Sequence, residues 1–273
     1  MFLQCGSFRL SLERPLVMGV VNVTPDSFSD GGLYAGTEQA VAHARQLIGE
    51  GADILDIGGE STRPGAAPVS LDEERRRVLP VLDALAGCGV PVSVDTRKPQ
   101  LMAEAIAAGA AMVNDITALG APGALAAVAR APVAVCLMHM QGEPGTMQEN
   151  PVYGDVVAEV RDFLEQRITA AERAGIARDR IVADPGFGFG KTVEHNLALL
   201  RSLGELRSLG VALMAGLSRK AMLGRLTGRE PRDRVPASVA AALLAVQNGA
   251  QLVRVHDVAA TRDALAVWQA VNR

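Results

Sequence analysis

Eight strand-length apolar runs recur along this chain, and each of them ends in polar or charged residues. The segments between the runs carry apolar residues at spacings of three and four, as amphipathic helices do. Regular alternation of strand and helix is typical of a parallel βα fold, in which the carboxyl ends of the strands meet at one face. The polar ends are therefore expected to form a single site. They are Asn22, Asp56, Asp95, Asn114 with Asp115, His139, Asp184, Ser218 to Lys220, and Arg254 with His256.

The return from helix to strand repeats one pattern, in which Gly-Ala precedes a buried run: EGADILDIGG from residue 50, AGAAMVNDI from 108 and NGAQLVRVHD from 248. Glycine there supplies the left-handed residue that ends a helix. Helix starts are predicted at Thr37, as an N-cap, and at Ser70 with Glu73, as a capping box. Further helices are predicted over 98–107, 122–130, 154–174, 192–208, 219–227, 236–248 and 258–271.

Two folds accommodate this alternation. An open doubly wound sheet usually has about five or six strands and a glycine fingerprint after the first. Here the first strand-to-helix turn is NVTPDSFSDGG, which is no such fingerprint. The α/β fold predicted is a closed (β/α)8 TIM barrel, one domain over residues 1–273. Residues 1–14 alternate weakly around Gly6 and are predicted to form a short N-terminal hairpin that closes the barrel bottom.

Composition limits the classes of partner that this chain is expected to bind. The formal net charge is −3 and no Lys/Arg-rich run occurs, which argues against a nucleic-acid partner. The cysteines, Cys5, Cys88 and Cys136, are odd in number and far apart, so a disulfide framework is not expected. No stretch reaches the roughly 18 apolar residues of a membrane helix. We expect a cytoplasmic protein that binds small molecules and neither membrane nor nucleic acid.

Cationic residues gather after the last two runs. Barrels often hold phosphate with these loops, and the chain places Ser218, Arg219 and Lys220 on one and Arg254 with His256 on the other. Charged donors bind phosphate strongly, so an anionic substrate is indicated. Arg219 alone is equally compatible with an outward ion pair. A Schiff-base lysine at Lys220, as in an aldolase-type lyase, is a further alternative.

Asp95, Asn114 and Asp184 end three different strands and can present a flat heterocycle with acceptors and donors. Alternatively, Asp95 and Asp115 cap the loops that follow them. The segment DPGFGFGKT has Pro185 where a Walker A loop needs glycine, so ATP binding is rejected. Its glycines instead allow close approach to a ligand, with Phe187 or Phe189 as a flat face.

Three connections, 22–36, 59–69 and 139–153, are longer than turns require and are either lids over the site or flexible surface.

Taken in order, the motifs MGVVNVTPDSFSDGG, DIGGESTRPGA, SVDTRKP, NDITA, DPGFGFGKT, GLSRKAMLG and LVRVHD closely resemble those of the dihydropteroate synthase family, from about residue 17 to 260. The resemblance implies a Mg²⁺-dependent, homodimeric transferase of folate biosynthesis and a sulfonamide target. Such an enzyme joins 6-hydroxymethyl-7,8-dihydropterin diphosphate to 4-aminobenzoate and releases pyrophosphate and 7,8-dihydropteroate.

The resemblance also implies roles for individual residues. The pterin would be bound by Asp95, Asn114, Ile116, Met138, Asp184, Phe189, Gly216 and Lys220. The diphosphate would be bound by Asn22, Thr62, Arg254 and His256, with Asn22 acting through Mg²⁺. The aminobenzoate pocket and lid loops would include Phe28, Ser61, Thr62, Arg63, Pro64, Phe189 and Ala221. Catalysis would depend on Asp95, Lys220, Arg254 and His256.

One position departs from the family pattern. Ala221 stands where the family usually has serine, whose hydroxyl meets the aminobenzoate carboxylate together with the helix N-terminus. Backbone N–H groups at that helix start are the donors that remain. The alternative function is a pterin-binding paralogue without synthase turnover. The two lid loops with Arg254 and His256 favour the enzyme, because a binding protein does not require them.

Overall fold

The computed structural model describes residues 1–23, 32–62 and 65–272. The predicted site residues Phe28, Arg63 and Pro64 lie outside the described residues. Within the described part of the chain, every helix is too short or too polar to cross a membrane.

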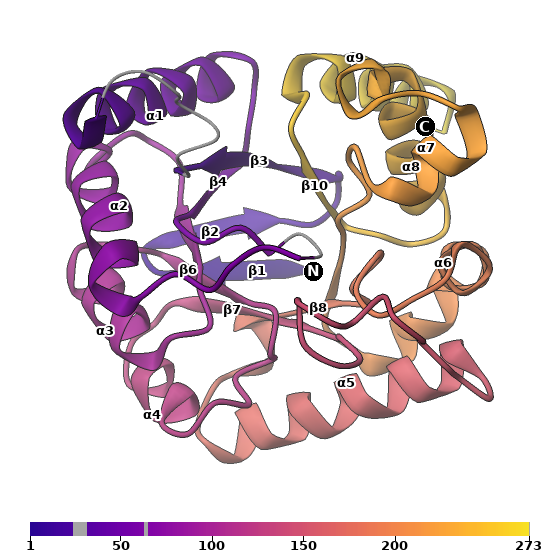
Figure 1. Cartoon of the computed structure of the whole chain (residues 1–273), viewed down its shortest axis with the longest axis horizontal. Helices are drawn as coiled ribbons and strands as arrows, with labels where there is room; N and C mark the ends of the chain where they lie inside the picture. Colours follow the sequence, from indigo (N-terminus) through magenta and orange to yellow (C-terminus); the bar gives the residue numbers. More distant parts are fainter. Residues whose placement is uncertain (24–31, 63–64, 273) are drawn as a thin grey trace.

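Eight parallel strands close into a barrel in the order β10-β3-β4-β5-β6-β7-β8-β9 (Figure 1). The strands are β3 (Leu16–Asn22), β4 (Ile54–Gly58), β5 (Val92–Asp95), β6 (Met112–Asp115), β7 (Ala134–Met138), β8 (Ile181–Asp184), β9 (Ala212–Ala215) and β10 (Leu252–Val255). Closure occurs where β10 pairs with both β9 and β3. The predicted TIM barrel is confirmed, and the open sheet is excluded because the first and last strands pair.

Helices surround the barrel as an outer ring (Figure 1). They are α1 (Gly32–Gly49), α2 (Leu71–Ala84), α3 (Pro99–Ala107), α4 (Ala124–Ala129), α5 (Val156–Arg173), α6 (Val193–Arg201), α7 (Ala221–Thr227), α8 (Val235–Gln247) and α9 (Val258–Val271). Short 3₁₀ helices occur at η2 (Arg178–Arg180), η3 (Leu203–Leu209) and η4 (Pro231–Asp233). At the predicted returns, Gly51, Gly109 and Gly249 have φ of 97°, 99° and 108°, the left-handed conformation expected of them.

Two predicted helices clearly differ from the observed ones in where they begin or end, and one predicted capping box is incomplete. Helix α1 begins before Thr37, a residue whose hydroxyl is tolerated inside a helix, so a capping-type residue does not by itself fix a start. The segment 192–208 divides into α6 and η3, because Asn248 donates to the carbonyl of Leu200 (2.7 Å) and satisfies the last turn of α6 from outside. Ser70 caps α2 by accepting from the backbone N–H of Glu73, whose own carboxylate pairs with arginines of α2 instead of completing a capping box.

Alternation along the strands separates two cores. On β4, Leu55 and Ile57 pack outward against the helices, whereas Ile54 joins the cluster inside the barrel. Side chains two residues apart share a face of a strand. Asp56 therefore also points into the barrel, one layer nearer the strand ends than Ile54. The same alternation aims the side chains of Asp95, Asn114 and Asp184 inward.

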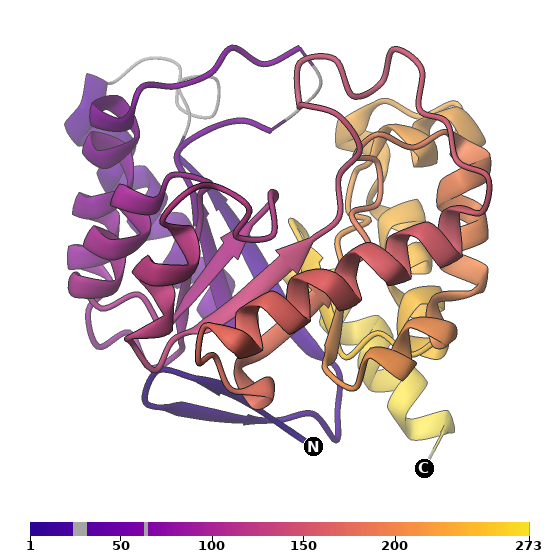
Figure 2. The same ribbon diagram turned by 90° about the horizontal axis from the view of Figure 1, so that it is seen from below.

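The N-terminal hairpin, β1 (Phe2–Cys5) and β2 (Phe8–Ser11), covers the end of the barrel at which the strands begin. Leu3 and Cys5 are buried against the inward side chains Met112, Cys136 and Val182. Figure 2 shows the hairpin below the barrel and the loops that follow the strands at the opposite end. With the bottom closed by apolar contacts, the polar strand ends remain as the open mouth.

Candidate active site at the barrel mouth

Arg254 lies at the mouth and contacts side chains from two other strands. Its Nε donates to Oδ2 of Asp56 at 2.6 Å, and its terminal nitrogen donates to Oδ2 of Asp95 at 2.9 Å. Asn114 Nδ2 donates to the same Asp56 oxygen at 3.0 Å. The structure thus brings four inward side chains into one connected network, although they are widely separated in sequence.

The charges in this network are strongly coupled. Burial raises the pKa of Asp95 to about 7, although Arg254 acts in the opposite direction. Burial acts to lower the pKa of Arg254, but the carboxylates of Asp56 and Asp95 outweigh it and hold the guanidinium in its charged form. Removing Arg254 would leave two buried carboxylates without a counter-charge. Arg254 therefore supplies the counter-charge for both Asp56 and Asp95.

Asp184 and Lys220 face the network from the other side of the mouth. Asp184 Oδ1 accepts from the backbone N–H of Gly186 at 2.7 Å, and burial raises the pKa of this carboxyl while Lys220 opposes the rise. A Cβ placed on Gly216 would lie 3.9 Å from both Asp184 Oδ2 and Arg254 Cβ. The missing side chain at Gly216 leaves space between these two residues.

An apolar slot adjoins the polar network. Ile116, Met138, Met147 and Phe189 form one buried cluster, with Met140 packed against it. The ammonium of Lys220 lies 4.1 Å from the centroid of the Phe189 ring. Three of the predicted slot residues, Ile116, Met138 and Phe189, are therefore together. Phe187, the other candidate flat face, is buried in the outer core.

The residues predicted to bind phosphate are only partly brought together at the mouth. Ser218 Oγ lies 2.9 Å from Nδ1 of His256 and accepts from the backbone N–H of that residue at 3.2 Å. Burial, Arg254 and Arg219 lower the pKa of His256 to about 3, so its ring is neutral near pH 7. Arg219 forms an ion pair with Asp257 at 2.5 Å, which confirms the alternative interpretation of this residue.

The remaining predicted residues lie around the rim. Asn22 ends β3, and a Cβ on Gly58 would meet its Oδ1 at 3.9 Å and Asp95 Oδ2 at 3.7 Å. Ser61 and Thr62 follow β4 and are half-buried. Ala221 is exposed and is the first residue of α7.

Two buried residues received no role from the sequence, and one predicted alternative is settled. Asp56 was expected at the site as a polar strand end, and the structure shows it fully buried and hydrogen-bonded to Arg254. Lys191 is buried behind the DPGFGFG loop, and only its place next to that motif hinted at a role. Asp115 points outward and accepts from the N–H groups of Thr117 and Leu119, so it caps its loop as the alternative predicted.

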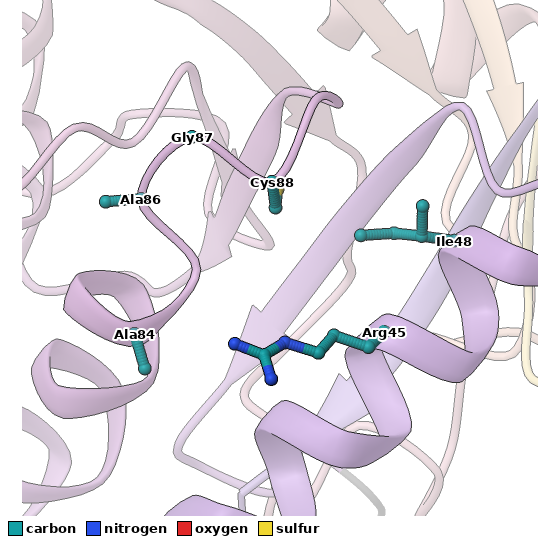
Figure 3. Close-up of a pocket in the computed structure, with 6 residues that line it drawn as sticks. All are labelled: Arg45, Ile48, Ala84, Ala86, Gly87 and Cys88. Atoms are coloured by element: carbon teal, nitrogen blue, oxygen red, sulfur yellow. The ribbon is translucent and has the colours of Figure 1, made fainter.

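A surface pocket far from this chemistry lies between the ends of α1 and α2. It is lined by Arg45, Ile48, Ala84, Ala86, Gly87 and Cys88 (Figure 3). These residues lie at or just after the carboxyl ends of α1 and α2, shortly before the next strands begin. The pocket is therefore at the bottom of the barrel, opposite the polar strand ends. The convergence of carboxylates, amide and cations marks the mouth as the candidate active site.

Residues 18–256 match the family of pterin binding enzymes. The chain belongs to this family. A dihydropteroate synthase from Neisseria meningitidis serogroup B is 55% identical to it over 98% of this chain and 97% of the relative.

Solved structures agree over the whole barrel. A dihydropteroate synthase from Xanthomonas albilineans with 4-aminobenzoic acid is 59% identical, covers 99% of this chain and 98% of its own, and has a TM-score of 0.94. The enzyme from Burkholderia cenocepacia complexed with 7,8-dihydropteroate is 54% identical, covers 99% and 96% of the two chains, and has a TM-score of 0.91.

Proposed function

We propose that this chain is a dihydropteroate synthase, which condenses 6-hydroxymethyl-7,8-dihydropterin diphosphate with 4-aminobenzoate to give 7,8-dihydropteroate and pyrophosphate. The observation that carries the proposal is the convergence of Asp95, Asn114, Asp184 and Lys220 beside one apolar slot. Relatives that cover nearly the whole chain are synthases of this kind. The enzyme is a transferase of folate biosynthesis.

The pterin ring is held by paired polar contacts and an apolar face. Carboxylates of Asp95 and Asp184 accept N–H groups from the aminopyrimidinone edge, and the amide of Asn114 both donates and accepts. Ile116, Met138 and Phe189 supply the apolar face of the slot. Because these groups are fixed by strands and by one another, the ring is oriented before reaction.

Departure of the diphosphate requires positive charge at the leaving group. Lys220 and Arg254 provide cations at the mouth, and neutral His256 provides an N–H donor next to Ser218. The electron-rich dihydropterin stabilises positive charge on its methylene, so the leaving group can depart before the arylamine attacks. The arylamine is neutral near pH 7 and needs no strong general base. Electrostatic preorganisation is then the main catalytic contribution.

A Mg²⁺ ion fits the residues present. Mg²⁺ at phosphate sites is usually bound by one or two protein oxygens, water and substrate phosphates. Asn22 offers one carboxamide oxygen at the end of β3, on the side that faces Asp95. When bound, the ion would neutralise charge on the diphosphate.

The aminobenzoate end of the site is built differently from the usual family pattern. Ala221 has no hydroxyl, so the donors left at this position are the backbone N–H groups at the start of α7. Ser61 and Thr62 contribute hydroxyl groups from the loop after β4. We place the aminobenzoate between this loop and α7.

Incubation of the purified protein with both substrates and Mg²⁺ tests the proposal through release of pyrophosphate. Asp184→Asn removes a carboxylate acceptor and should weaken pterin binding roughly 10- to 100-fold, measured by calorimetry. Pterin binding without pyrophosphate release would indicate the non-catalytic paralogue instead. Unchanged pterin affinity in Asp184→Asn would show that this carboxylate does not contact the pterin.

The Schiff-base lyase has less support. Lys220 lies over the Phe189 ring and close to the Asp184 carboxylate, a setting that stabilises a charged ammonium and not a nucleophilic amine. Borohydride trapping with carbonyl substrates should leave Lys220 unmodified.

We also propose that the protein works in the cytoplasm as a homodimer. All three cysteines are free thiols, as in a reducing compartment. Exposed apolar side chains at Leu226, Leu244 and Val267, on α7, α8 and α9, offer surface that a second copy would cover. Sedimentation equilibrium tests the oligomeric state, and a monomer at micromolar concentration would contradict it.

A further inference from the structure

Lys191 is a buried cation that the reaction does not use. Only 3% of its surface is exposed. Its ammonium donates to the carbonyls of Gly186 and Phe189, both at 3.0 Å, and lies 2.9 Å from Nδ1 of His139. A longer contact of 3.4 Å reaches the carbonyl of His139. Burying a charged group is costly, so this cage of acceptors needs an explanation.

The loop 185–190 satisfies only part of its own carbonyls. Gly186, Gly188 and Gly190 have φ of 67°, 80° and 60°, which turns successive peptide planes away from any strand or helix ladder. A Cβ on Gly186 would lie 1.9 Å from the carbonyl oxygen of His139, so the loop is pressed against that segment. The carbonyl of Gly186 accepts from the backbone N–H of Phe189 at 3.1 Å as well as from Lys191, whereas the carbonyl of Phe189 accepts from the Lys191 ammonium. A buried carbonyl left without its donor is destabilising, so Lys191 stabilises this shape of the loop.

The opposite face of the same loop forms the pterin slot. Phe189 packs with Ile116 and Met138 and lies beneath the Lys220 ammonium. Gly186 donates its N–H to Asp184. A displacement of the loop backbone would therefore move the flat face of the slot and release an Asp184 contact together.

His139 completes the cage from the end of β7. It is 6% exposed, and burial and Lys191 lower the pKa of His139 to about 3, so Nδ1 can accept from the ammonium. Its ring packs edge-on against Phe163, and Tyr153 beside it donates to the carbonyl of Gly190 at 2.8 Å. Burial lowers the pKa of Lys191 to about 7, against the effect of Asp184, yet a neutral amine keeps two N–H donors.

We infer that Lys191, held by His139, is a positioning residue of the pterin slot: it fixes the loop 185–190 in the shape that aims Phe189 and Asp184 at the ring. This role rests on the proposed synthase function. Lys191 acts through the loop, because its ammonium contacts the loop carbonyls and His139. The loop is also held at Gly188, whose N–H donates to Asn196 at 2.7 Å, so loss of Lys191 should loosen the loop without unfolding the barrel.

Lys191→Met keeps most of the length of the side chain and removes the donors. We expect its KM for the pterin diphosphate to rise by about tenfold or more, with kcat changed less, because the slot is misplaced and the leaving-group residues are not. Binding of 7,8-dihydropteroate, measured by calorimetry, should weaken in parallel. A folded Lys191→Met protein with wild-type pterin KM and affinity would overturn the inference.

A pair of variants at His139 tests the same contact if Lys191→Met fails to fold. His139→Asn retains an acceptor close to the Nδ1 position, whereas His139→Leu has nearly the same shape without one. The inference expects His139→Asn to keep a pterin KM near wild type and His139→Leu to raise it. Equal pterin KM values in the two variants would overturn it.

Arg180 provides a matched control at the bottom of the barrel. Its guanidinium also donates to loop carbonyls, including that of Val133 at 2.8 Å, but none of its partners borders the site. Arg180→Met should lower thermal stability and leave both KM values unchanged. If Lys191→Met behaves in this way, its role is structural only.

Absence of turnover and pterin binding in the wild type would count against the proposed function. Absence of a difference between the wild type and Lys191→Met would count against the positioning role.

Discussion

The carboxyl group of Asp95 has an unusual environment for a residue expected to accept N–H groups. Its side chain is 12% exposed at the mouth, receives one hydrogen bond from Arg254 at 2.9 Å, and has the carboxylate of Asp56 nearby. Burial favours the protonated form, and only the ionised form is purely an acceptor. The protonation of this single residue therefore links pH to recognition of the ring.

Pterin affinity should increase as the pH rises from 6 to 8. Because the pKa of Asp95 is raised to about 7, the protonated form predominates below that pH and the carboxylate above it. Between pH 6 and pH 8 the carboxylate fraction rises about tenfold, and affinity should follow it. Calorimetric titration with 7,8-dihydropteroate across this range measures the effect.

Asp95→Asn is the control for this pH dependence, since Lys191 titrates in the same range. The variant should bind the ring weakly and with nearly constant affinity from pH 6 to pH 8. A pH profile that keeps its wild-type slope in Asp95→Asn would assign the titration to another group.

At the scale of elements, an ion network fixes the base of the loop that follows β4. Lys98, at the start of α3, contacts the carboxylates of both Glu60 and Glu74. Arg97 pairs with Glu60 at 3.1 Å and with Glu143 of the loop 139–153 at 3.4 Å. The segments that begin two of the three candidate lids, 59–69 and 139–153, are thus held together beside the mouth. Ser61 and Thr62 extend from this point.

Lys98→Met should destabilise the protein by about 3 kcal/mol or more, because Glu74 is only 1% exposed and would keep a buried charge without a cation. Urea unfolding measures the loss. The double variant Lys98→Met with Glu74→Met should recover much of it, since both charges are then removed.

The half-exposed pair of Arg75 and Glu104 also joins α2 to α3 and serves as the comparison, and Arg75→Met should cost clearly less. Equal losses for Arg75→Met and Lys98→Met would show that burial of Glu74 adds nothing to the network.

At the scale of the whole molecule, the barrel separates stability from chemistry along its axis. The hairpin and the inner apolar layer occupy one end, and the polar network occupies the other. Figure 2 shows the hairpin and the loops that follow the strands at opposite ends of the molecule. Leu3 is 1% exposed at the bottom, and its contacts are with inward residues such as Met112 and Val182. Residues at the two ends have few shared partners, so their effects should be independent.

Leu3→Ala should therefore lower the free energy of unfolding by about 3 kcal/mol through the cavity it creates, and leave the KM of both substrates unchanged. Phe2, its 43% exposed neighbour on the hairpin, is the control, and Phe2→Ala should cost much less. A change in pterin KM for Leu3→Ala would show that the bottom of the barrel is coupled to the mouth.

The amino-acid pattern specified the barrel and the face on which its site lies. Strand alternation, glycine at the helix ends and the polar residue after each apolar run are local signals, and backbone geometry converts them directly into parallel strands with inward side chains at the mouth. Together with the motifs that carry the family resemblance, they identified Asp95, Asn114, Asp184, Lys220 and Arg254 as neighbours. They also left Asp95 and Asp115 undistinguished, since both are carboxylates at strand ends.

The partners of those side chains, in contrast, depend on the folded barrel. Arg254 pairs with Asp56 across 198 positions, Arg219 turns to Asp257, and Lys191 inserts behind the glycine loop next to His139. A hydrogen-bond partner depends on the register of the closed barrel and on which groups are withdrawn from water together. Neither property is encoded in a short stretch of sequence, because both arise only when distant strands and loops meet.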